Sequence, residues 1–128
     1  MFHRPVLDRV LELEPRARGR GLRNVPSTLD VFDSHFPRLP VLPGVVVLDS
    51  LAELARLVLP GAPETWRLGG VGRTQFRHYV RPGDQLLLAV EIERLEPKSA
   101  TLSGEARVAG RLVARARQIR LVREEPLA

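Results

Sequence analysis

Cysteine is absent from the 128-residue sequence, which excludes disulfide bonds, thiol catalysis and thiolate metal sites. Aromatic residues make up 5% of the chain, and Lys98 is its one lysine. No apolar run approaches the roughly 20 residues that a membrane-spanning helix needs. The N-terminus begins with His3, Arg4 and Pro5 after two residues and lacks the apolar core of a signal peptide. We therefore expect a cytoplasmic protein that does not enter a membrane.

The composition fits one domain over residues 1–128, because a chain of this length can build a single core. The net charge of +5 raises the question of nucleic-acid binding. The arginines are scattered along the chain and have acidic neighbours, whereas a binding patch is usually clustered. We therefore expect no nucleic-acid partner. A basic surface also suits an acidic protein partner.

One helix is predicted over residues 44–59. Pro43 and Gly44 open a run without internal helix breakers, and Pro60 and Gly61 end it. The first turn, from Val45 onward, is apolar on every side, so we expect it to be buried on every side.

The polar residues of this helix form one narrow stripe. Asp49, Glu53 and Arg56 follow one another at spacings of four and three residues. An amphipathic helix with a solvated stripe would show this pattern. A functional carboxylate at Asp49, inserted into apolar surroundings, would show it as well, because a buried carboxylate marks a candidate site.

The remaining pattern predicts strands on both sides of the helix, two before it and four in hairpins after it. A sheet folded around one helix would cover the apolar surface of that helix. Residues 69–72 contain three glycines without the ending of a phosphate loop, so we expect a bulge or a close backbone approach there. The predicted strands are 5–14, 22–29, 66–80, 86–95, 100–108 and 112–122, with a basic turn over 15–21.

The stretch His-Phe-Pro-Arg-Leu-Pro-Val-Leu-Pro-Gly-Val, beginning at His35 and followed by Asp49, resembles the signature of the FabZ-type 3-hydroxyacyl-acyl carrier protein dehydratases. Residues 3–11, 76–86 and 110–116 also resemble segments of that family, in the same order. The resemblance implies an α+β hotdog fold, in which an antiparallel sheet wraps one long central helix. It also implies dehydration of 3-hydroxyacyl thioesters to trans-2-enoyl thioesters, without a metal or another cofactor.

The resemblance implies roles for individual residues. His35 would be the base at C2, and Asp49 would be the acid that protonates the C3 hydroxyl. The Gly44 N–H, at the helix N-terminus, would stabilise the thioester oxyanion. Other substrate-binding positions would be Pro43, Val45 and Glu53.

Three positions depart from the usual family pattern. Asp49 stands in place of a glutamate, although the related FabA-type enzymes use aspartate there. Ser34 replaces a glycine and Glu53 replaces a glutamine. A second carboxylate one turn from Asp49 would raise the pKa of the acid, unless Arg56 pairs with it.

The resemblance implies an acyl carrier protein partner that carries the acyl chain on a phosphopantetheine arm. It also implies a homodimer with shared active sites, in which His35 of one subunit faces Asp49 of the other, and it leaves open a hexamer built as a trimer of dimers. Two alternatives keep the fold: a hotdog thioesterase, which would release a free acid, and a non-catalytic acyl-binding subunit.

Overall fold

The computed structural model describes residues 7–25 and 44–124, which form mainly strands and one α-helix. The strands before the helix are β1 (Arg9–Glu14) and β2 (Arg18–Asn24), and the helix, α2, spans Gly44–Val58. A short 3-10 helix, η1 (Pro63–Thr65), leads into β3 (Trp66–Val71) and β4 (Thr74–Phe76). Three long strands follow: β5 (Gln85–Leu95), β6 (Ser99–Val108) and β7 (Arg111–Arg123).

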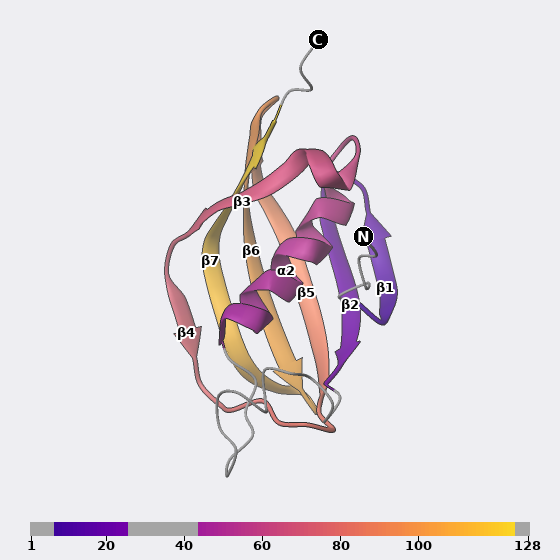
Figure 1. Cartoon of the computed structure of the whole chain (residues 1–128), viewed down its shortest axis with the longest axis vertical. Helices are drawn as coiled ribbons and strands as arrows, with labels where there is room; N and C mark the ends of the chain where they lie inside the picture. The colour runs from indigo at the N-terminus through magenta and orange to yellow at the C-terminus, as the bar shows by residue number, and fades with distance from the viewer. Residues whose placement is uncertain (1–6, 26–43, 125–128) are drawn as a thin grey trace.

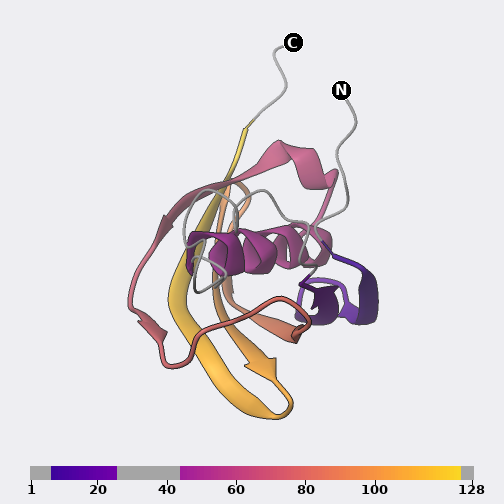
Figure 2. The same cartoon turned by 60° about the horizontal axis from the view of Figure 1, so that its bottom comes forward.

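The described strands form one seven-stranded sheet in the order β1-β2-β5-β6-β7-β3, and β4 also pairs with β7. Every pairing is antiparallel. Figure 1 shows α2 lying across one face of the sheet, and Figure 2 shows the sheet curving around the helix. The predicted hotdog architecture, a sheet wrapped around one long helix, is therefore confirmed.

Small residues on the inner face of the sheet let α2 lie close to it. A Cβ atom built on Gly19 of β2 would lie 2.7 Å from Val58 Cγ2 of the helix. Ala114 and Ala116 of β7 are buried on this face, two residues apart as strand alternation requires. The largest fully buried apolar side chains of the core are Trp66, Leu51, Leu54, Leu86, Leu88, Leu102, Ile119 and Leu121.

The second strand begins earlier than the sequence predicted. The turn expected over 15–21 is confined to residues 15–17, and β2 begins at Arg18. Gly19 and Gly21 are buried within this strand, where their missing side chains make room for Leu54 and the helix end. Both glycines therefore allow β2 and α2 to approach closely and do not form a turn. Residues 26–29 of the predicted strand lie outside the described residues.

The strand predicted over 66–80 is two strands, so the prediction of four hairpin-linked strands after the helix was wrong. Both β3 and β4 pair with β7 and not with β5, the strand that follows them. The register of β3 shifts between Leu68 and Gly70, which places Gly69 in a bulge. The expected bulge in the glycine-rich segment is therefore confirmed, and β4 continues along β7 in the same direction as β3.

Candidate active site

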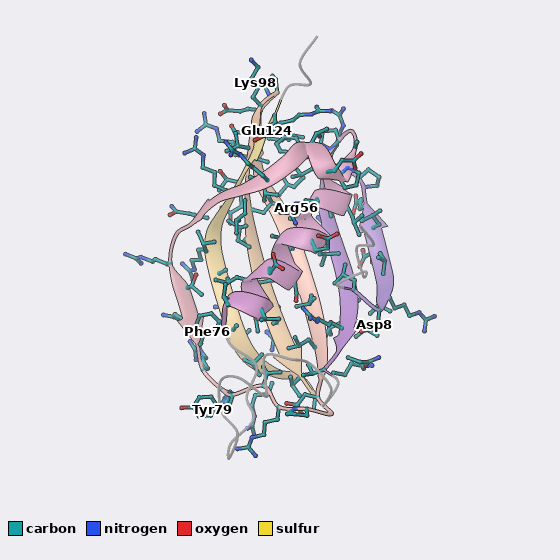
Figure 3. The ribbon with its side chains drawn as sticks, in the orientation of Figure 1. Asp8, Arg56, Phe76, Tyr79, Lys98 and Glu124 are labelled. Carbon is teal, nitrogen blue, oxygen red and sulfur yellow. The ribbon has the colours of Figure 1, made fainter. Side chains whose placement is uncertain are left out.

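An aromatic ring covers the beginning of α2. A Cβ atom built on Gly44 would lie 2.6 Å from Cζ of Phe76, a residue of β4 that is 51% exposed. Figure 3 shows Phe76 at the level of the first turn of α2. The first N–H groups of a helix have no partner within the helix and carry partial positive charge. Backbone donors and an apolar ring therefore meet at the Gly44 end of the helix.

Val45 and Asp49 lie on the side of α2 that faces away from the sheet. Val45 is 69% exposed and Asp49 is exposed, whereas Val47 is buried. The prediction that the first turn is buried on every side was therefore wrong for the single chain. The reason is geometric: the sheet covers one side of the helix, and positions four residues apart share the opposite side. Asp49 is not surrounded by apolar side chains of the described sheet.

The second carboxylate of the stripe is neutralised by an arginine. Glu53 Oε2 accepts a hydrogen bond from Arg56 Nη1 at 3.1 Å. Arg56 Nε also donates to the Trp66 carbonyl oxygen at 2.9 Å, which ties the last turn of α2 to β3. The pairing of Glu53 with Arg56, which the sequence left open, is thus present. It places a compensating positive charge beside the Glu53 carboxylate.

Sequence analysis did not single out Arg23 of β2, whose side chain is bound to Ser50, the residue after Asp49. Its Nη1 donates to Ser50 Oγ at 2.7 Å, and Ser50 Oγ donates to the Val46 carbonyl oxygen at 2.8 Å. Burial lowers the pKa of the Arg23 guanidinium, while the carboxylates of Asp49 and Asp8 raise it. The sequence does hold a signal for this residue: Arg23 follows Gly19 and Gly21 at spacings of two residues, so in a strand all three positions share one face.

An open cavity of about 770 Å³ lies beside β4. Phe76, which packs on Gly44, lines it together with Tyr79, Arg81 and Arg111. Figure 3 shows Tyr79 at the end of the molecule where the connection to β5 turns back. The cavity combines apolar rings with arginines, which suits a ligand with an apolar chain and a negative charge.

Two of the six predicted site residues, His35 and Pro43, lie outside the described residues. The other four, Gly44, Val45, Asp49 and Glu53, follow one another along α2. Gly44, Val45 and Asp49 are accessible, and Glu53 is half-buried in its pair with Arg56. The roles of all six remain predictions.

Residues 7–25 and 44–124 contain no group of three His, Cys, Asp or Glu side chains that could hold a metal ion. The same residues contain no helix of the length and apolarity needed to cross a membrane.

Solved structures with the same arrangement define the class of fold. The chain aligns over 94% of its length with the dehydratase heterocomplex ApeI:P from Xenorhabdus doucetiae, with a TM-score of 0.71 and 23% identity, covering 100% of that chain. It aligns over 96% with an uncharacterized protein from Pyrococcus horikoshii, with a TM-score of 0.75 and 14% identity, covering 88% of that chain. These likenesses show the hotdog fold.

Sequence comparison identifies the family. Residues 17–111 match the model of the ApeI-like family, described as ApeI dehydratase. A 3-hydroxyacyl-acyl-carrier-protein dehydratase FabZ from Caldanaerobacter subterraneus is 35% identical over 94% of this chain and 88% of the relative. The FabZ of Enterococcus faecalis is 39% identical over 87% of this chain and 82% of the relative. The chain therefore belongs to the ApeI-like dehydratases, and it is an enzyme of the FabZ type.

Proposed function

We propose that this dehydratase removes water from 3-hydroxyacyl chains carried by acyl carrier protein and forms trans-2-enoyl thioesters, with His35 and Asp49 as its catalytic pair. FabZ enzymes, named for this reaction, are similar to the chain over most of its length. One hotdog domain over residues 1–128 would carry the reaction, in the cytoplasm, as part of fatty acid or related acyl-chain biosynthesis. The observation that carries the residue assignment is the accessible Asp49 carboxylate one turn beyond Val45, on the exposed side of α2.

The chemistry requires a base, an acid and an oxyanion donor. His35 would take the C2 proton, since neutral imidazole is suited to this near neutral pH. The C2–H electron pair then forms the C2=C3 bond, the C3–O bond breaks, and the oxygen leaves as water with a proton from Asp49. The Gly44 N–H would stabilise negative charge on the thioester oxygen. The Phe76 ring packs over Gly44 and would shield part of this helix end from water.

The exposed side of α2 supports a shared site between two copies of the chain. Val45 is apolar and 69% exposed beside the Asp49 carboxylate, in a position that a second subunit could cover. In the proposed homodimer, His35 of one subunit would reach Asp49 of the other. Such dimers could build a hexamer, as a trimer of dimers.

The cavity beside β4 supports an acidic carrier. Arg77, Arg81 and Arg111 line it together with Phe76, which packs on Gly44. Acyl carrier proteins are acidic, and their phosphopantetheine arm carries a phosphate, so arginines at the mouth suit both. The thioester would then approach the first turn of α2 past the Phe76 ring.

The deciding experiment measures enoyl absorbance with a 3-hydroxyacyl thioester for wild type, His35→Ala and Asp49→Asn. We expect product from wild type and a loss of roughly a hundredfold or more in kcat for either variant. Glu64→Gln, which removes an exposed carboxylate of η1, is the matched control and should leave kcat unchanged.

Each other result points to a specific alternative. A free-acid product would identify a thioesterase. Acyl-chain binding without turnover, unchanged in His35→Ala, would identify a non-catalytic subunit. Full activity in Asp49→Asn would move the acid elsewhere, and Glu53, one turn further along α2, would be tested next.

A further inference from the structure

The exposed side of α2 is open at one end and closed at the other. Val45, in the first turn, is 69% exposed, and Asp49 in the next turn is also exposed. Glu53 is half-buried, and the Arg56 side chain in the last turn is only 20% exposed. Figure 1 shows β3 beginning beside the C-terminal end of the helix, and Figure 3 places Arg56 there. A ligand that lies along this side of α2 can therefore extend from the first turn toward the last, where Arg56 stands in its way.

An ion pair forms the closed end. Arg56 Nη1 donates to Glu53 Oε2 at 3.1 Å, and Arg56 Nε donates to the Trp66 carbonyl oxygen at 2.9 Å. Trp66 is itself fixed in place, because it is 1% exposed and its Nε1 donates to the Pro60 carbonyl oxygen at 2.9 Å. The pair is thus anchored to the buried start of β3. Two charged groups held in this way offer no apolar surface to a hydrocarbon chain.

The proposed site fixes the direction in which an acyl chain would extend. In that site the Gly44 N–H holds the C1 oxygen, and Asp49 meets the C3 hydroxyl. Because a helix rises about 1.5 Å per residue, the two positions lie roughly 7.5 Å apart along the axis of α2. The carbons beyond C3 would continue in the same direction toward Glu53, which lies about 6 Å further along the axis. An extended chain advances about 1.2 Å per bond, so about the eighth carbon would reach the ion pair.

We propose that the Glu53–Arg56 pair determines the acyl-chain length that this dehydratase prefers, by ending the path of the chain at about the eighth carbon. This inference rests on the proposed function, with Gly44 and Asp49 in the roles given above. A carbon placed beside the pair displaces water from two charges and gains no apolar contact, which costs free energy. Each carbon up to this length adds buried apolar surface, and carbons beyond it do not.

The experiment measures how kcat/KM depends on chain length, by enoyl absorbance with 3-hydroxyacyl pantetheine thioesters of four to twelve carbons. For wild type we expect kcat/KM to rise by up to about fourfold per added carbon and to stop rising near the eighth. Combined Glu53→Leu and Arg56→Leu replaces the pair by apolar side chains, so the rise should continue to twelve carbons. The ratio of kcat/KM between the twelve-carbon and the eight-carbon substrate should increase about tenfold or more over wild type.

Two further variants complete the design. Combined Glu53→Met and Arg56→Met provides a second apolar pair if the leucine variant does not fold by circular dichroism. Combined Arg94→Leu and Glu96→Leu is the matched control, because it removes an exposed ion pair of 2.6 Å at the end of β5. We expect this control to show the chain-length profile of wild type.

Three results would overturn the inference while leaving the proposed function intact: a wild-type profile without a break near the eighth carbon, a break at the same length in wild type and in the apolar variants, or an equal change of profile in the control. Failure of the proposed function has a different signature, because wild type would then form no enoyl product at any chain length. In that case the role of the Glu53–Arg56 pair falls with it.

Discussion

At the scale of single residues, the contact between Gly44 and Phe76 makes the start of α2 sensitive to one methyl group. In Gly44→Ala the new Cβ atom would meet the ring at 2.6 Å, so Phe76 must move. We expect a loss of about 1–2 kcal/mol in the free energy of unfolding, measured by denaturant titration. Adding Phe76→Ala should recover at least about 0.5 kcal/mol relative to additivity. Strictly additive effects would show that the two residues do not touch.

A second residue-scale prediction concerns Arg56, which joins helix and sheet. Its side chain is only 20% exposed, and it bonds both Glu53 and the Trp66 carbonyl oxygen. Arg56→Ala leaves both acceptors without their donor, so we expect a loss of about 1–3 kcal/mol in stability. The control is Arg67→Ala, because Arg67 pairs with Glu124 at 3.1 Å in an exposed ion pair, which contributes about 0.5 kcal/mol or less. Equal losses of stability in the two variants would contradict the role of Arg56 in joining α2 to β3.

At the scale of elements, the distance between α2 and β2 depends on the absence of side chains at Gly19. Gly19→Ala places a methyl group 2.7 Å from Val58 Cγ2, so strand and helix must separate or repack. We expect it to reduce the free energy of unfolding by about 1–3 kcal/mol in thermal or denaturant unfolding. Gly70→Ala in β3 is the matched control: its Cβ atom would meet nothing within 4 Å, and its effect should stay within about 0.5 kcal/mol.

The long strands were predictable from the sequence, because each has one face in the core and one in solvent. In β5 the alternation of Leu86, Leu88 and Val90 with polar or half-buried neighbours is the pattern seen in the structure. β2 was placed too late, because glycine marks a turn and a close approach equally well. Sequence patterns do not state which element lies opposite Gly19.

The site was predictable in part. The position of Gly44 at the helix start and the stripe of Asp49, Glu53 and Arg56 follow from the chain itself. The exposure of Val45 did not: the sequence predicted burial, but apolar character does not say which surface covers a residue, and the sheet covers only one side of α2. Arg23 was missed because its meaning depends on a contact with Ser50, 27 residues away.

At the scale of the whole molecule, a site shared between subunits predicts complementation. His35→Ala and Asp49→Asn chains, mixed by co-expression, should form dimers in which one of the two sites has both intact residues. With random pairing half of the dimers are mixed, so about a quarter of wild-type turnover should return. Each variant alone serves as the control. Activity no higher than the sum of the separate variants would place both residues of a site in one subunit.

Docking of an acidic carrier predicts a second whole-molecule effect. Combined Arg81→Glu and Arg111→Glu reverses two charges at the cavity and should raise KM for an acyl chain on carrier protein roughly tenfold, with a weaker dependence on salt. KM for a short pantetheine thioester should change little. Combined Arg67→Glu and Arg94→Glu, the same change of charge at two exposed arginines that do not line the cavity, is the control. An equal rise in KM for both substrates would count against carrier docking.

The placement of β7 also bears on how the chain folds during synthesis. This strand pairs with β6, β3 and β4, and it supplies the core residues Ile119 and Leu121. A ribosome that has translated α2, η1 and the four strands β3 to β6 has therefore not yet made the strand that joins β3 and β4 to the rest of the sheet. Until β7 emerges, β3 and β4 lack the strand with which they pair and the core lacks Ile119 and Leu121, so the growing chain exposes apolar surface that a chaperone can bind.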